Sequence, residues 1–244
     1  MAIQTFPLVL KSVRMIAPEV KHFEFEREDK AAFPFIPGQF ITFHIPTEEK
    51  TLRRSYSIAT LPGEHHKIEF AAGFVKEGPA SELLFHLKPG DILQATGPFG
   101  KLVLKDETPK RYILVATGTG VTPFRSMLPD LKQRLENSDL EVHLLLGVRT
   151  REHLIYKNDF MQMAKDHPNF HFHACYSREK LEAPESFEHT GYVQNYLFEL
   201  PLDKDGDVVY LCGNPNMIDE AFNGLKERDF DIHNIRREKY ISSN

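Results

Sequence analysis

The pattern of apolar residues changes character close to the middle of this 244-residue chain. Before residue 105, short apolar runs alternate with turn signals such as the Pro-Gly pairs at 37–38 and 89–90. Several short strands at this spacing are typical of an antiparallel sandwich or barrel. After residue 110, nearly continuous apolar runs alternate with segments of helical periodicity, as in a parallel sheet covered by helices. The sequence therefore predicts two domains of different class.

The boundary between the two domains is expected at residues 105–110, a polar stretch with a proline and no large apolar side chain. Residues 1–106 are expected to form an N-terminal antiparallel β-barrel, with one short helix that begins at an N-cap serine, Ser81. Residues 107–244 are expected to form a parallel five-stranded Rossmann-like α/β sheet. Its expected helices cover residues 124–135, 153–163, 193–197 and 216–228.

Charge and hydropathy narrow the class of partner. The formal net charge is -5 with both signs interspersed, whereas a nucleic-acid binder needs a concentrated basic face. No stretch approaches the roughly 20 apolar residues of a membrane helix, and the first residues lack the apolar core of a secretory leader. We therefore expect a cytoplasmic monomer with neither a nucleic-acid nor a membrane partner.

Cysteine and histidine placement gives no metal motif. Cys175 and Cys212 are the only cysteines and form no CxxC pair, so neither a disulfide framework nor an iron-sulfur cluster is indicated. On a strand, His171 and His173 would point to the same face, which we interpret as a solvated strand face. No metal site is expected, so electron transfer would need an organic cofactor or a separate carrier.

A glycine-rich loop at residues 116–123 follows the first expected strand of the second domain. Gly118 and Gly120 let the backbone approach a ligand, and Pro123 suits the first position of a helix whose amino terminus attracts anions. The loop lacks the third glycine of the common dinucleotide fingerprint, and no acidic residue follows the second strand. The loop therefore predicts a pyrophosphate site that departs from that fingerprint.

Arginines follow the second and third expected strands of this domain. Arg149 occupies the place where a carboxylate would bind a ribose 2′-hydroxyl, and a cation there suits a 2′-phosphate. The third strand ends similarly, at Ser177 and Arg178. This pair favours NADPH over NADH, although NADH remains possible, and solvated arginines at loop starts are the alternative interpretation.

The segment from Arg54 to Ser57 combines groups that suit a flavin nucleotide. Arg54 can form charge-assisted hydrogen bonds with a pyrophosphate. Tyr56 offers a flat face for an isoalloxazine ring, and Ser57 offers a hydroxyl group. Without further motifs, an ordinary strand pair would explain these residues equally well.

The chain carries these motifs as part of an ordered set. The set comprises Arg54-x-Tyr56-Ser57, Gly78-x-x-Ser81, Gly97-Pro98-Phe99-Gly100, Thr117-Gly118-Thr119-Gly120-x-x-Pro123, Cys212-Gly213-Asn214-Pro215-x-Met217 and Glu238-Lys239-Tyr240. In this order, over essentially the whole chain, it resembles the ferredoxin–NADP reductase family. The resemblance implies an N-terminal barrel that binds FAD and a C-terminal sheet that binds the nicotinamide nucleotide. The residues themselves do not distinguish FAD from FMN.

The resemblance also implies roles around the flavin. Ser57 is expected near flavin N5, and Glu238 and Tyr240 are expected to cover the face opposite Tyr56. Some family members end at that aromatic residue, whereas this chain continues through residues 241–244. The residues expected to contact the flavin are Arg54, Ser55, Tyr56, Ser57, Ala72, Gly73, Phe74, Gly78, Ala80, Ser81 and Tyr240.

Cys212 would lie beside the reacting nicotinamide, where we expect it to position the ring; a buried structural cysteine is the alternative. Ser57, Cys212, Glu238 and Tyr240 are the candidate catalytic residues. The residues expected to contact the nicotinamide nucleotide are Thr117, Gly118, Thr119, Gly120, Thr122, Pro123, Arg149, Ser177, Arg178, Cys212, Gly213, Asn214 and Met217.

By resemblance, the expected function is hydride transfer between NADPH and FAD, with single electrons passing to or from a ferredoxin or flavodoxin. The alternatives are an NADH-dependent reductase component of an oxygenase system and, more distantly, a non-catalytic flavin-binding redox sensor or assembly subunit. A basic dock for an acidic carrier is expected from Arg53, Lys76, Arg236, Arg237 and Lys239.

Overall fold

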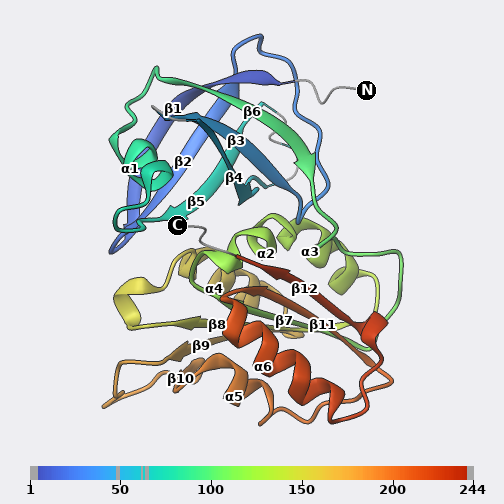
Figure 1. Ribbon diagram of the computed structural model, residues 1–244. Helices are drawn as coiled ribbons and strands as arrows, with labels where there is room; N and C mark the ends of the chain where they lie inside the picture. The colour runs from blue at the N-terminus through green and yellow to red at the C-terminus, as the bar shows by residue number, and fades with distance from the viewer. Residues whose placement is uncertain (1–4, 48–49, 62, 64–65, 241–244) are drawn as a thin grey trace. The chain divides into compact units, whose positions relative to one another are not determined.

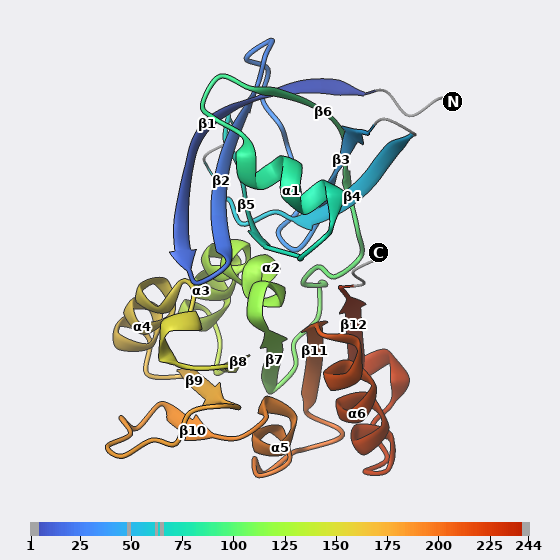
Figure 2. The same cartoon turned by 60° about the vertical axis from the view of Figure 1, so that its left-hand side comes forward.

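The computed structural model describes residues 5–47, 50–61, 63 and 66–240. These residues form two compact units, shown in Figures 1 and 2. The first contains the described residues up to 104 together with 122–127, and the second contains 105–121 and the described residues from 128 onward. Among the described residues, no helix has the length and apolar character needed to span a membrane.

The first unit is built on an antiparallel sheet of six strands in the order β4-β3-β6-β1-β2-β5. The strands are β1 (Phe6–Ala17), β2 (Val20–Arg27), β3 (Phe40–Pro46), β4 (Thr51–Ser57), β5 (Ile68–Gly73) and β6 (Ile92–Phe99). The sheet curls so that its two ends meet, because Ala59 N, just after β4, donates to Glu69 O on β5 at 2.7 Å. Stacked phenylalanines fill the interior, with Phe23 and Phe70 ring centroids 5.0 Å apart. The antiparallel class predicted for this half is confirmed.

Helix α1 (Pro79–His86) begins earlier than the sequence suggested. Its N-cap residue is Gly78, and Pro79 supplies the fixed φ angle that suits a first helical position. Ser81 therefore lies inside the helix, and its Oγ accepts a hydrogen bond from Val75 N at 2.7 Å. The expectation that Ser81 caps the helix is wrong, since its hydroxyl holds the preceding turn instead.

The second unit contains a parallel sheet in the order β10-β9-β8-β7-β11-β12. The strands are β7 (Arg111–Thr117), β8 (Glu141–Val148), β9 (Phe170–Tyr176), β10 (Glu188–Thr190), β11 (Asp207–Gly213) and β12 (Ile235–Lys239). The parallel α/β class is confirmed, but the sheet has six strands rather than the five predicted. Neither outer strand has a continuous apolar run: β10 has three residues, and only Ile235 of β12 is buried.

Helices and short 3-10 turns connect these strands, as the ribbon in Figure 1 shows. They are η1 (Gly118–Val121), α2 (Thr122–Ser126), α3 (Leu128–Glu136), η2 (Arg151–His153), α4 (Lys157–Asp166), α5 (Val193–Leu197), α6 (Pro215–Lys226) and η3 (Ile232–Asn234). The single helix expected at 124–135 is divided at Met127, because Pro129 has no N–H with which to continue the ladder. The helix expected from 153 begins only at Lys157, after Tyr156 adopts a left-handed conformation with φ 57°.

Candidate cofactor sites

The glycine-rich loop after β7 is packed directly against the end of β11. A Cβ atom on Gly120 would lie 2.5 Å from the carbonyl oxygen of Cys212, so the close approach requires glycine. Gly118 has φ +52° and no atom within 4 Å of its ideal Cβ position. Gly120 therefore allows close packing, while Gly118 supplies the positive φ of the turn and has open space beside its Cα atom.

The turn after β11 interlocks with this loop. Gly213 has φ +121°, and a Cβ there would lie 2.5 Å from Thr117 Oγ1. That hydroxyl oxygen accepts from Asn214 N at 2.8 Å. The side chain of Asn214 caps α6 by accepting from Asn216 N and Met217 N. The two motifs predicted to bind the nicotinamide nucleotide thus form one continuous surface at the carboxyl edge of the parallel strands.

The side chains of three predicted motif residues lie more deeply than a ligand contact would require. Thr122 and Met217 are 1% and 4% exposed, and Pro123 is also buried. Met217 packs in the core formed with Ile113, Val115 and neighbouring residues. Any contact of these three residues with a nucleotide would therefore be made by the backbone.

Cys212, Glu238 and Tyr240 are brought together by the pairing of β11 with β12. Cys212 lies opposite Glu238 in the register, and Tyr240 N donates to Gly213 O at 2.8 Å. Burial raises the pKa of the Cys212 thiol well above its usual range, and the Glu238 carboxylate raises it further. A hydrogen bond with Tyr240 opposes this shift without reversing it. The sulfur is therefore a protonated thiol near neutral pH, which is unsuited to nucleophilic attack.

Backbone hydrogen bonds continue past the carboxyl ends of β8 and β9 and place the two predicted arginines side by side. Ser177 N donates to Val148 O at 3.0 Å, and Arg178 N donates to Arg149 O at 2.9 Å. Both arginine side chains are exposed. Two adjacent cations at the carboxyl edge of a parallel sheet can bind a phosphate through charge-assisted hydrogen bonds.

Strand β4 presents the predicted flavin-binding residues along its length. Tyr56 stacks on Phe70 with ring centroids 4.8 Å apart, and burial raises the pKa of its phenol to about 12. Ser57 is buried, whereas the hydroxyl of Ser55 is hydrogen-bonded to Thr42 Oγ1 at 2.9 Å. Arg54 is half-buried and donates to the carbonyl oxygen of Arg53 at 3.0 Å. Tyr56 is therefore fixed in orientation by aromatic packing, as a stacking platform requires.

The turn between β5 and α1 offers backbone amides to an anion. Ala72 and Gly73 end β5, and Phe74 N donates to Glu19 O at 2.6 Å. Gly78 N donates to Val75 O, which closes the turn, and no side chain caps the first-turn amides of α1. Amides at Ala80 and Ser81 have no intrahelical acceptor, because they lie in the first turn. This turn fits a phosphate group.

One part of the predicted basic dock is occupied by structural ion pairs. Arg236 forms a two-pronged ion pair with Glu107, and its side chain is only 10% exposed. Lys239 pairs with Asp219 at 2.6 Å. The expectation that Arg236 helps to dock a carrier is therefore wrong, since its guanidinium anchors the segment before β7. Sequence patterns could not reveal this pair, because its members lie 129 residues apart.

Comparisons with known proteins assign a cofactor class to each half of the chain. A family model described as an oxidoreductase FAD-binding domain matches residues 7–104, and an oxidoreductase NAD-binding domain matches residues 114–222. Ferredoxin–NADP reductase B of Sorangium cellulosum is 33% identical over 221 residues, which is 88% of each protein. The electron transfer component of toluate 1,2-dioxygenase from Pseudomonas putida is 26% identical, over 98% of this chain and 68% of that protein. The crystal structure of the Amycolatopsis reductase GcoB matches with a TM-score of 0.88 at 26% identity, over 99% of this chain and 71% of that one.

Proposed function

This chain belongs to the ferredoxin–NADP reductase family and is a flavoprotein oxidoreductase, and we propose that it couples NADPH to a separate ferredoxin or flavodoxin. The observation that carries the proposal is the convergence, within the second unit, of the loop at Gly118, the capped turn at Asn214 and the Cys212–Glu238 pair. A loop and a turn suited to a nucleotide and the candidate catalytic side chains therefore lie at the same strand ends.

Each unit has residues suited to one cofactor. In the first, Arg54 and the α1 turn at Gly78 would bind the flavin pyrophosphate, and Tyr56 would support the ring. In the second, Gly118 and the Arg149–Arg178 pair would bind the phosphates of NADPH. When bound, the flavin supplies the conversion between two-electron exchange with a nicotinamide and one-electron exchange with a carrier.

The remaining side chains act by position and charge. Because the Cys212 thiol stays protonated, we assign it a packing role beside the nicotinamide rather than covalent chemistry. Ser57, a buried hydroxyl at the end of β4, would orient the flavin edge by hydrogen bonding. Glu238 and Tyr240 complete the wall next to Cys212.

The two arginines provide the test of nucleotide choice. We expect the wild-type kcat/KM to be higher with NADPH than with NADH. Arg149→Gln and Arg178→Gln should each lower kcat/KM for NADPH by roughly tenfold or more, the cost of one charge-assisted hydrogen bond. Values for NADH should change by less than about threefold, because NADH lacks the 2′-phosphate. Lys180→Gln, an exposed change close by, is the matched control.

A wild-type preference for NADH would overturn the assignment of Arg149 and Arg178. It would favour the second candidate, an NADH-dependent reductase component of an oxygenase system, which the similarity to the Pseudomonas putida protein supports. Anaerobic stopped-flow reduction of a purified ferredoxin and a purified flavodoxin tests the carrier separately. Failure with both carriers alongside normal flavin reduction by NADPH would leave the reductase chemistry standing and reject the carrier.

A further inference from the structure

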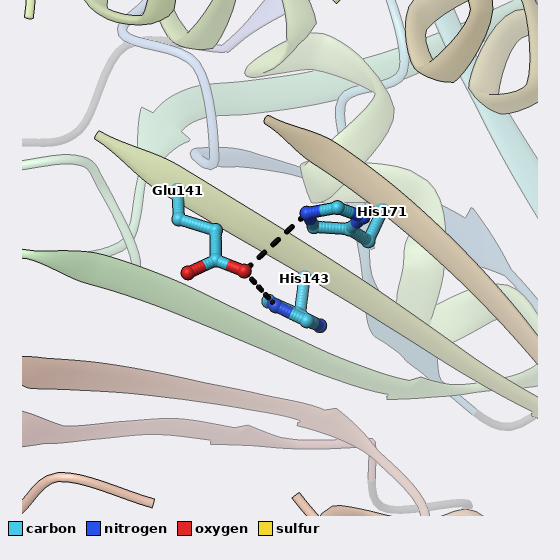
Figure 3. Close-up of side chains that lie close together, drawn as sticks. All are labelled: Glu141, His143 and His171. Atoms are coloured by element: carbon cyan, nitrogen blue, oxygen red, sulfur yellow. Dashed lines mark hydrogen bonds and ion pairs between the residues drawn. The ribbon is translucent and has the colours of Figure 1, made fainter. Parts of the chain in front are cut away.

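Two histidines and a glutamate meet on one face of the parallel sheet, as Figure 3 shows. Glu141 and His143 lie on β8, and His171, which pairs with His143 in the register, lies on β9. Glu141 Oε1 is 2.7 Å from His143 Nε2 and 3.3 Å from His171 Nε2. The three ligand atoms all lie within 4.8 Å of one another. A hydrogen-bonded strand pair thus brings three side chains of the types that can ligate a metal ion close together.

We propose that Glu141, His143 and His171 bind a divalent transition-metal ion of the Zn²⁺ type. Two imidazoles and one carboxylate form a ligand set that Zn²⁺ accepts in tetrahedral geometry, with water as the fourth ligand. Ligands about 2.0–2.1 Å from a tetrahedral ion stand about 3.3–3.4 Å apart. The Glu141–His171 separation of 3.3 Å already has this value. The Glu141–His143 separation must widen from 2.7 Å, and the His143–His171 separation, which is within 4.8 Å, must reach the same value.

The partly exposed side chain of Glu141 has room to make this adjustment. Glu141 is the first residue of β8, and its side chain is 43% exposed, as is 39% of His171. His143 is held more firmly, with 10% of its side chain exposed. A metal ion would therefore find one fixed imidazole and two adjustable ligands, and solvent can reach the open coordination position.

A second layer of hydrogen bonds orients the fixed ligand. His143 Nδ1 lies 3.1 Å from His173 Nε2, and His173 Nδ1 lies 3.0 Å from the Tyr196 hydroxyl and 3.2 Å from His189 Nε2. With a metal ion on Nε2, the neutral His143 ring carries its proton on Nδ1 and can donate a hydrogen bond to His173 Nε2. His173 then carries its own proton on Nδ1 and can donate a hydrogen bond to the Tyr196 hydroxyl or to His189 Nε2. Metal-binding histidines in proteins are oriented by acceptors of this kind.

The site lies away from the nucleotide loops. Glu141 begins β8 and His171 is the second residue of β9, whereas the loop at Gly118 follows the carboxyl end of β7. Because the strands are parallel, the metal would join two strands near their amino ends. Its expected effect is on stability and not on hydride transfer.

The test uses tag-free holoprotein from which metal has been removed with EDTA. The protein is dialysed to equilibrium against Zn²⁺, and the bound metal is then measured by mass spectrometry. We expect one Zn²⁺ per chain and a melting temperature, followed by circular dichroism, raised by roughly 5 °C at a hundredfold excess over Kd. Glu141→Ala and His171→Ala should each weaken binding at least tenfold. His173→Gln should weaken it by roughly tenfold through loss of orientation.

Matched controls separate this site from casual binding to surface histidines. His233→Ala removes an exposed histidine in the same unit and should leave the stoichiometry unchanged. Glu141 and His171 are chosen because their partly exposed side chains can be truncated without opening the core. Absence of a stoichiometric Zn²⁺, or binding that survives in the Glu141→Ala/His171→Ala double variant, would overturn the proposal. Either result leaves the nucleotide assay unaffected, so the proposed reductase activity is judged independently.

Discussion

Three arginines that follow β8 and β9 have different surroundings, although the sequence presents them in the same way. Arg149 and Arg178 are exposed and adjacent. Arg151 instead donates from Nε and Nη2 to Glu188 and from its backbone N–H to Glu179. The difference depends on Glu188, a carboxylate in a short edge strand whose side chain is 2% exposed. Sequence motifs could identify the exposed pair but could not identify the buried partner.

Replacing Glu188 should make the second unit less stable and less sensitive to acid. The hydrogen bond from Arg151 is the main cause that lowers the Glu188 pKa to about 2, with help from Tyr176 and a backbone amide. A depressed carboxyl pKa stabilises the fold above the unfolded pKa and loses that effect as pH falls. Glu188→Gln should therefore cost about 2 kcal/mol in the free energy of unfolding at pH 7.

The difference in the free energy of unfolding between Glu188→Gln and wild type should disappear as the pH falls from about 4.5 to 2, because wild-type Glu188 becomes protonated in this range. Urea unfolding of both proteins across this range measures the effect. Glu182→Gln, which changes an exposed carboxylate in the loop before β10, is the control and should change stability by less than about 0.5 kcal/mol. A constant difference between Glu188→Gln and wild type at all pH values would contradict this account.

At the scale of elements, strands with continuous apolar runs were predictable and short polar elements were not. β7, β8 and β11 are buried along nearly their whole length, so their sequences carry a strong signal, whereas β9 alternates buried residues with half-buried histidines before its buried end. β12 forms because its backbone can hydrogen-bond to the edge of β11, not because its own sequence favours a strand. The break at Met127 likewise depends on Pro129 and is invisible to hydrophobic periodicity alone.

The two glycines in the loop after β7 are needed for different reasons, Gly120 for close packing and Gly118 for its positive φ. Gly120→Ala would place a Cβ 2.5 Å from the Cys212 carbonyl oxygen and force the loop away from β11. We expect this change to weaken NADP⁺ binding at least tenfold and to cost about 1–3 kcal/mol of stability. Gly118→Ala meets open space and should cost only roughly 1 kcal/mol, from its positive φ. Flavin-monitored titration with NADP⁺ and thermal unfolding compare the two variants.

The comparison is informative because the substitutions differ only in position. Equal effects of Gly118→Ala and Gly120→Ala on stability would show that backbone strain, not collision, dominates in this loop. Loss of bound flavin in Gly120→Ala would contradict the assignment of this loop to the nicotinamide nucleotide.

At the scale of the whole molecule, the sequence supported the division into an antiparallel half and a parallel half and the assignment of one cofactor class to each half. Contacts between segments distant in the sequence could not be predicted from it. His143 and Glu141 lie far in sequence from His171, so the spacing of His171 and His173 alone predicted a solvated face. Glu107 and Arg236 similarly lie 129 residues apart. The roles of the candidate catalytic residues and the domain boundary remain predictions.

The ion pair between Glu107 and Arg236 should hold the segment before β7 to β12. Burial alone would raise the pKa of Glu107, but the hydrogen bond and charge of Arg236 outweigh it and lower the pKa overall. Glu107→Gln leaves the mostly buried Arg236 without its counter-charge and should cost about 2–3 kcal/mol in urea unfolding. Asp106→Asn, an exposed neighbour, is the control. Additive effects in the Glu107→Gln/Arg236→Gln double variant would contradict a direct coupling.

The position of β12 beside β11 also sets an order of events during synthesis. Proteins leave the ribosome amino end first, so β11 and α6 emerge before the strand that carries Glu238. Until then, β11 is an outer strand and Cys212 lacks the neighbour it faces in the finished sheet. The sheet in which Cys212 is fully buried is therefore complete only after β12, the last strand to be made, has paired with β11.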